Sequence, residues 1–136
     1  MLALAGCAGM ESASEPGAAS PLDKTYWRLE TVDDMAVPPG AGRLEPHIQF
    51  DPEKKRVTGY SGVNIFSGGY STNGSHLRMS SMASTRRAGS PELMQFEATY
   101  LKALSATRSY RVDGDILEFL NVSGHVVARF EGQKAP

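Results

Sequence analysis

Two adjacent arginines, Arg86 and Arg87, are the side chains of this sequence whose type and spacing best suit binding of an anion. They lie in residues 84–89 (Ser-Thr-Arg-Arg-Ala-Gly), directly before a predicted helix that begins at Pro91. A helix N-terminus offers free N–H groups and guanidinium groups bind carboxylates and phosphates, so this segment could hold either anion. A solvated loop is the simpler interpretation of the same residues.

Residues 59–70 contain the other candidate binding side chains. Asn64 could contact a ligand, although an Asn beside a glycine in a turn more often caps backbone donors or takes left-handed geometry. Tyr60, Phe66 and Tyr70 could line an apolar cleft for an acyl chain or a partner helix. Alternating aromatic residues in β-rich proteins are more often core or cross-strand pairs.

Catalytic and metal-binding patterns are missing from the sequence. His47, His76 and His125 are far apart and lack the spacing of a helical metal pair. There is no Gly-x-Ser-x-Gly elbow and no phosphate-binding Gly-x-x-x-x-Gly-Lys loop. Because no base, nucleophile and orienting group converge, we predict no catalytic residues, no metal site and no cofactor, and the protein is not expected to be an enzyme.

Cys7 is the only cysteine, so we predict no internal disulfide. It ends a Leu-Ala-Gly-Cys motif that is similar to the bacterial lipobox, in which small residues admit a signal peptidase and the thiol takes a thioether lipid. We therefore predict lipidation at Cys7. Only six residues precede it, which suggests a truncated start. A short disordered tail with a chance cysteine is the alternative.

Lipidation at Cys7 predicts a place in the cell envelope. Ala8, which follows the cysteine, is not the Asp that retains many lipoproteins in the inner membrane, so we expect the outer membrane, facing the periplasm. The sequence has no run of about 18 or more apolar residues, the length that a helix needs to cross a bilayer. With 14 Lys and Arg against 15 Asp and Glu, the net charge of -1 argues against nucleic acid as a partner.

The elements that would position these residues form one domain, since 136 residues suffice for a single core. We predict a signal remnant and flexible tether over residues 1–24, a globular domain over 25–131 and a tail over 132–136. Ser90 as N-cap and Pro91 at the first position predict a helix over 91–104. Asn73 and Gly74 predict a hairpin. Strand-like segments are residues 26–32, 47–50, 56–60, 65–70, 77–82, 109–112, 116–120 and 125–130.

This order of elements predicts a mostly β (α+β) fold. Short connections with glycine turns favour antiparallel neighbours. We expect a curled antiparallel sheet or a partly open barrel of about seven or eight short strands, with the helix packed on one face or end.

The segment 59–70 (Gly-Tyr-Ser-Gly-Val-Asn-Ile-Phe-Ser-Gly-Gly-Tyr) resembles the META domain family, which includes heat-shock-inducible envelope proteins of the HslJ type. The resemblance extends over residues 25–131 through segments 27–29, 84–89, 100–104, 114–117 and 127–130, and through Tyr110. It implies a small β-rich fold with a packed helix and an exported location. The family commonly has cysteines at the positions of Val63 and Gly89, so any redox role of such a pair is in doubt here.

Two non-enzymatic hypotheses follow, and a third class, a hydrolase or redox enzyme, would require convergent polar residues with perturbed pKa values in a pocket. The first is a non-catalytic envelope lipoprotein that supports stress tolerance or envelope integrity by binding an envelope protein or an apolar ligand. The second is a pilot-type assembly lipoprotein that holds a partner helix or lipid tail of an outer-membrane secretion complex in a split barrel. An exposed apolar groove near Tyr60 to Tyr70 would favour the second. The sequence indicates neither the partner nor the oligomeric state.

Overall fold

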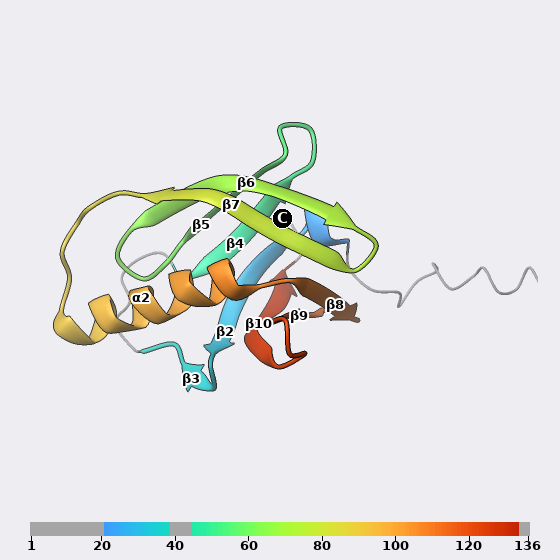
Figure 1. Cartoon of the computed structure of the whole chain (residues 1–136). Helices are drawn as coiled ribbons and strands as arrows, with labels where there is room; N and C mark the ends of the chain where they lie inside the picture. The colour runs from blue at the N-terminus through green and yellow to red at the C-terminus, as the bar shows by residue number, and fades with distance from the viewer. Residues whose placement is uncertain (1–20, 39–44, 134–136) are drawn as a thin grey trace, which may run out of the picture.

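A single antiparallel sheet of nine strands dominates the described residues and closes on itself (Figure 1). The structure is a computed structural model that describes residues 21–38 and 45–133. Neighbouring strands follow the order β10-β9-β8-β7-β6-β5-β4-β2-β3, and the pairing of β10 with β2 closes the barrel. The strands are β2 (Tyr26–Val32), β3 (Met35–Ala36), β4 (His47–Asp51), β5 (Arg56–Tyr60), β6 (Ile65–Asn73), β7 (His76–Ser84), β8 (Ser109–Asp113), β9 (Ile116–Leu120) and β10 (Val126–Gln133).

The predicted mostly β fold is confirmed, and the barrel is closed. Side chains alternate between the two faces of the strands, so Ile48 and Phe50 of β4 point inward while Gln49 between them is exposed. The strand β3 was missed because Met35 and Ala36, both exposed, form too short a segment to show alternation.

The hairpin between β6 and β7 is longer than predicted. Asn73 pairs with His76, so only Gly74 and Ser75 form the turn. Gly74 has a φ of +63°, a conformation that glycine adopts without a steric penalty. The Asn-Gly signal was therefore correct, but the strands continue to its edge.

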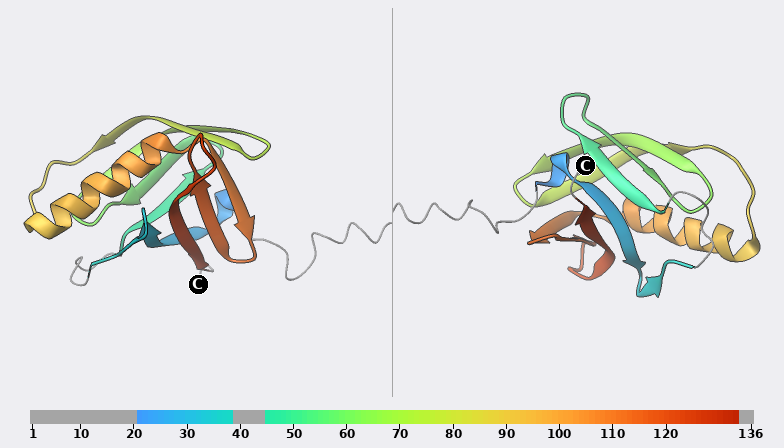
Figure 2. Two further views of the ribbon diagram at one scale, coloured as in Figure 1. Left: turned by 60° about the horizontal axis from the view of Figure 1, so that its bottom comes forward. Right: turned by 180° about the vertical axis from the view of Figure 1, so that it is seen from behind.

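The helix α2 (Pro91–Ala106) extends two residues beyond its predicted end at residue 104. The Ser90 hydroxyl accepts a hydrogen bond from the Leu93 N–H, as expected of an N-cap. Figures 1 and 2 show α2 running alongside β7, and it also contacts β10 and β2. Its buried face carries Phe96, Tyr100, Ala103 and Leu104.

The barrel interior is filled by aromatic and aliphatic side chains. Phe119 lies between Phe50 and Phe130, with ring centroids 6.3 and 4.9 Å away. Tyr100 of the helix continues this contact to Phe66, 5.6 Å away. Trp27 is fully buried, and its indole N–H donates to the Leu22 carbonyl of the 3-10 helix η2 (Leu22–Lys24). This contact ties a turn that precedes residue 25 to the barrel.

The seam between β7 and β8 is the weakest contact in the barrel. These strands pair at a single position, His76 with Ser109, and two backbone hydrogen bonds flank it. Every other neighbouring pair of barrel strands has at least two paired positions. Helix α2, which connects β7 to β8, fills the space beside the seam.

Within the described residues, no helix combines the length and apolar character needed to span a bilayer.

Candidate functional site

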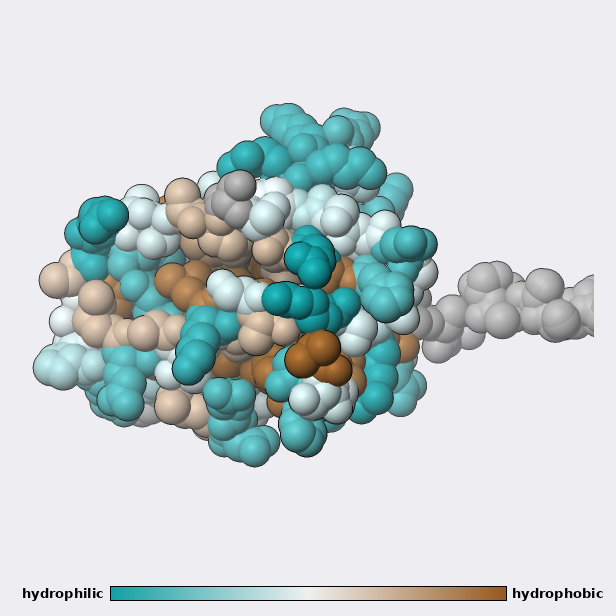
Figure 3. Space-filling view, viewed as in Figure 1, coloured by the Kyte–Doolittle hydropathy of each residue, from teal (hydrophilic) through white to brown (hydrophobic). Residues whose placement is uncertain are grey.

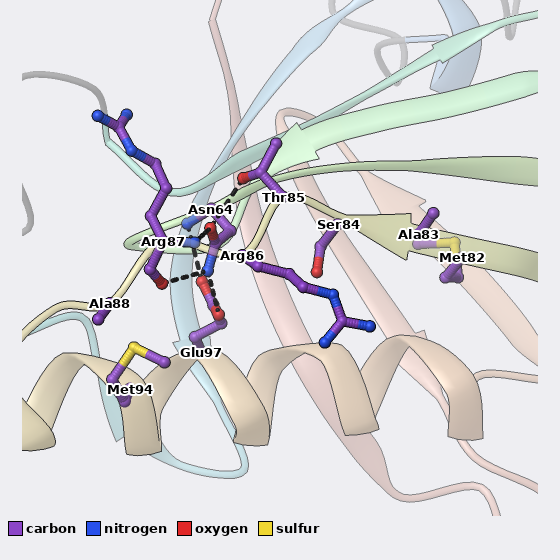
Figure 4. Close-up of a pocket in the computed structure, with 10 residues that line it drawn as sticks. All are labelled: Asn64, Met82, Ala83, Ser84, Thr85, Arg86, Arg87, Ala88, Met94 and Glu97. Carbon is purple, nitrogen blue, oxygen red and sulfur yellow. Dashed lines mark hydrogen bonds between the residues drawn. The ribbon is translucent and has the colours of Figure 1, made fainter.

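A groove of about 690 Å³ lies between the C-terminal half of β7 and the N-terminal half of α2. Figure 3 shows apolar surface between these two elements with hydrophilic side chains on both sides, and Figure 4 shows the lining residues. The lining consists of Asn64, Met82, Ala83, Ser84, Thr85, Arg86, Arg87, Ala88, Met94 and Glu97.

A buried carboxylate, Glu97, forms the inner wall of this groove and is 6% exposed. Its Oε1 accepts from the Ser61 hydroxyl at 2.7 Å and from the Asn64 backbone N–H at 2.8 Å. Its Oε2 accepts from the Asn64 side-chain amide at 2.8 Å. Three donors of one turn thus replace the water that the carboxylate loses on burial.

The Asn64 side chain joins this turn to the segment that follows β7. Its Oδ1 accepts from the Thr85 hydroxyl at 2.8 Å and from the Arg87 backbone N–H at 2.6 Å. Its Nδ2 donates to Glu97 and also to the Arg87 carbonyl at 3.1 Å. The partners fix the orientation of the amide, because Oδ1 contacts only donors and Nδ2 only acceptors.

The turn that carries Asn64 depends on its neighbours in sequence. Gly62 has a φ of +113°, which an L-residue rarely adopts, and the Tyr60 hydroxyl donates to the Gly62 carbonyl at 3.1 Å. The Ser61 N–H donates to the Asn64 carbonyl at 2.9 Å. The Gly-x-Asn sequence therefore orients the Asn64 amide toward the helix.

The two candidate arginines differ in direction. In Figure 4 the Arg86 side chain extends along the groove between β7 and α2, whereas the Arg87 side chain points away from the helix. Both are exposed. Among the described residues neither guanidinium has a hydrogen bond or ion pair, although the Arg87 backbone binds Asn64.

The candidate aromatic residues do not gather at the groove. Phe66 is 1% exposed and belongs to the core, and Tyr70 packs edge-on against Phe50 with centroids 4.9 Å apart. Burial, helped by Asp23 and Asp51, raises the pKa of Tyr70. Tyr60 is half-buried and binds its own turn. These three side chains therefore support the barrel and the turn.

Glu97 was missed by sequence reasoning. It lies on the helix face that also buries Phe96, Tyr100 and Leu104. An acidic residue within an apolar stripe of a helix was the signal in the sequence that could have indicated a buried carboxylate. Met82 and Met94, which line the groove, were also missed. A bulge gives β7 one extra residue opposite Gly68 and turns Met82 across that glycine.

Positions 63 and 89 lie next to each other. A Cβ placed on Gly89 would be 3.7 Å from the Cβ of Val63, within the range of a disulfide. The two positions at which the resemblance implied cysteines are thus one contact in space, occupied here by a valine and a glycine.

The part of the chain that the structure describes holds no group of three or more His, Asp or Glu residues close enough to bind a metal ion. Cys7 and the predicted tether up to residue 20 lie outside the described residues, as do residues 134–136 of the predicted tail.

A family model of the META domain matches residues 20–134, which is most of the chain. The chain belongs to the META domain family. Its turn at Asn64 and the segment 84–89, which carried the resemblance in sequence, are the two parts that the Asn64 amide holds together. No curated protein matches the sequence at a significant level.

Three solved structures share the fold of this META domain. An NMR structure of a protein from Burkholderia xenovorans has a TM-score of 0.66 at 21% identity, and the match covers 90% of this chain and 97% of that one. A second NMR structure has a TM-score of 0.64 at 22% identity, covering 81% and 90%. A crystal structure of a DUF4847 family protein from Bacteroides vulgatus has a TM-score of 0.59 at 13% identity, covering 85% and 96%.

Proposed function

We propose that this META domain protein is a non-catalytic binding module of the bacterial envelope, anchored by a lipid on Cys7, that supports stress tolerance by holding an envelope partner in the groove between β7 and α2. The observation that carries the proposal is the groove itself. It combines the apolar side chains of Met82 and Met94 with a guanidinium, that of Arg86, which has no partner among the described residues.

The buried polar cluster supports binding rather than catalysis. Ser61 is fully buried, and its hydroxyl contacts the Glu97 carboxylate and a backbone carbonyl. Among the described residues no histidine lines the groove, so the serine has no general base of the usual kind. Because Ser61 is fully buried, it also has no access to a substrate. The META domain family is not known as a family of enzymes.

The pilot-type alternative is favoured by one feature, the single paired position between β7 and β8. A partner helix or lipid tail would have to enter the barrel there. Helix α2 already covers this side, and its Tyr100 and Leu104 are fully buried in the core. We therefore place the partner outside the barrel, in the groove.

The anchor is tested by intact mass and membrane fractionation of the protein expressed in a bacterium with a complete signal, beside a Cys7→Ser variant. We expect a mass increase of lipid size and membrane retention that the variant loses. An unmodified protein in the soluble fraction would contradict the anchor.

The groove is tested by complementation in the native host lacking its own copy, challenged with heat or detergent. We expect the Arg86→Ala variant to lose at least half of the protection given by the wild type. The control variant is Lys54→Ala, which removes one exposed cation far from the groove and should complement fully. Equal activity of both variants at equal protein levels would overturn the proposed role of the groove.

A further inference from the structure

Strand β7 has an open edge along the groove. Between Arg78 and Ser84 this strand pairs with β6 on one side, apart from the bulge at residues 81–82. Within the described residues no strand pairs with the other side, because pairing with β8 stops at His76. Unpaired strand edges are templates for another strand, and soluble proteins usually cover them. Here a groove lies beside the edge.

Some backbone groups on this edge of β7 point away from β6. The Leu77 N–H donates to the Arg108 carbonyl, away from β6, so by the alternation of an antiparallel strand Met79 also faces away from β6. Beyond the bulge, the Thr85 N–H donates to Ile65 of β6, which leaves Ser84 facing the groove. Ser84, which lines the groove, and Met79, farther along the same edge, thus have N–H and C=O groups directed away from β6, where an added strand could pair with them.

The side chains beside this edge suit a polypeptide of mixed character. Met82 and Met94, both half-buried, and Ala83 and Ala88 supply apolar surface. Methionine is flexible and adapts to side chains of different shape. The volume of about 690 Å³ is in the range of ligand-binding clefts.

The charge along the edge is positive and uncompensated. Arg28, Arg111 and Arg129 form ion pairs on β2, β8 and β10. Within the described residues Arg78, Arg86 and Arg87 have no side-chain hydrogen bond or ion pair, and all three lie on β7 or directly after it. Among the described residues, the only acid that lines the groove is Glu97, which is buried and accepts three hydrogen bonds from the turn.

We propose that the groove binds an extended acidic segment of a partner protein, which adds as a strand to the open edge of β7 while its carboxylates meet Arg86 and its apolar side chains meet Met82 and Met94. This deepens the proposed function, on which it rests, by naming the form and chemistry of the partner. Main-chain hydrogen bonds to β7 supply affinity, and alternate side chains supply specificity.

The test uses the full chain with Cys7→Ser and an acetylated hexapeptide amide of alternating glutamate and valine as the probe. We expect NMR titration to shift the amide signals of Met79 and Ser84 at up to about 1 mM peptide, the range of a weak complex. The same peptide with lysine in place of glutamate should bind at least tenfold more weakly. No shift at these amides would overturn the proposal.

Two further peptides and variants separate strand addition from simple attraction of an anion. N-methylation of alternate amides removes the hydrogen-bond donors from one edge of the peptide and leaves its charge unchanged. If that edge pairs with β7, the methylated peptide should bind at least tenfold more weakly. Arg86→Ala should weaken binding about tenfold, whereas its neighbour Arg87→Ala, whose side chain points away from the helix, should change it less than threefold.

Equal binding of the methylated peptide would show an anion site only, and would overturn strand addition. Shifts at Met79 and Ser84 that depend on protein concentration without peptide would show pairing of two copies, and would also overturn it. If the peptide fails to bind while Arg86→Ala still fails in complementation, the proposed function stands and this inference falls.

Discussion

Asn64 is the residue on which the candidate site depends, although its role is indirect. Its amide makes two bonds as acceptor and two as donor, to the helix and to the segment after β7. These bonds join the turn at Asn64 to the segment 84–89, and both segments carried the resemblance in sequence. Asn64 positions the groove and is itself buried, at 2% exposure.

Asn64→Ala should destabilise the fold by about 3 kcal/mol, because it removes four hydrogen bonds and leaves Glu97 with one donor fewer in a buried site. Denaturant unfolding of the variant and the wild type measures this difference. Asn73→Ala, an exposed position at a turn, is the control and should cost less than about 1 kcal/mol. A similar small cost at both positions would contradict the structural role of Asn64.

The buried phenol of Tyr100 makes the stability of the fold depend on pH in the alkaline range. Burial, with a smaller contribution from Tyr26, raises the pKa of Tyr100 well above its usual value. The unfolded chain ionises this phenol near pH 10 and the folded chain does not, so the stabilisation is complete below about pH 10 and is lost as the pH rises further. We expect the free energy of unfolding to fall between about pH 9 and pH 11.

Tyr100→Phe should reduce that fall and should cost about 1 kcal/mol near neutral pH, since the hydroxyl no longer donates to the His47 carbonyl. Denaturant unfolding of the variant and the wild type, at neutral pH and across the alkaline range, provides the measurement. Tyr70→Phe is the comparison, and its smaller burial predicts a weaker change of the pH profile. An unchanged profile in Tyr100→Phe would contradict the assignment.

At the scale of elements, the loop before α2 and the turn before β6 are held together without a covalent link. A Cβ on residue 89 would lie 3.7 Å from the Cβ of Val63, a distance that a disulfide can span. We therefore expect the double variant Val63→Cys and Gly89→Cys, in a Cys7→Ser background, to form a disulfide on oxidation. The bond should stabilise the oxidised protein by about 3 kcal/mol over its reduced form. Intact mass and unfolding with and without reductant measure both effects.

The single variant Val63→Cys, which has no partner thiol, is the control for that prediction and should show no difference between oxidising and reducing conditions. A double variant that remains reduced in air, or that loses stability on oxidation, would show that the two segments are not adjacent in the way described.

At the scale of the whole molecule, the barrel is closed on one side by β10 with β2 and is nearly open at β7 with β8. The closing pair has six paired positions and the open one a single position. Buried contacts and ladder hydrogen bonds protect amides from exchange with solvent. We therefore expect the amides of Met79 and Ser84 to exchange faster than those of Leu77 and Thr85, whose hydrogen bonds are made.

Hydrogen exchange followed by NMR tests this expectation residue by residue. The barrel strand β10 serves as the internal reference, since its amides should be among the most protected. Strong protection at Ser84 in the free protein would mean that the edge of β7 is already covered.

The sequence alone determined the elements that have strong local causes. Ser90 and Pro91 began the helix where capping chemistry requires it, Asn73 and Gly74 marked the hairpin, and alternation located eight strands and so the mostly β class. The resemblance at residues 59–70 and 84–89 identified the family that the match over residues 20–134 confirms. Local propensity and spacing suffice for such features because each involves neighbours in the chain.

Only the tertiary structure decided where the candidate residues meet. Asn64 and Glu97 are 33 positions apart, and Gly89 lies against Val63 across a hairpin, so neither contact has a local signal. The structure also separated Arg86, which enters the groove, from Arg87, and moved Phe66 into the core. Closure of the barrel and the open edge of β7 depend on pairing between distant strands, because the buried surface that stabilises them exists only when the whole sheet is assembled.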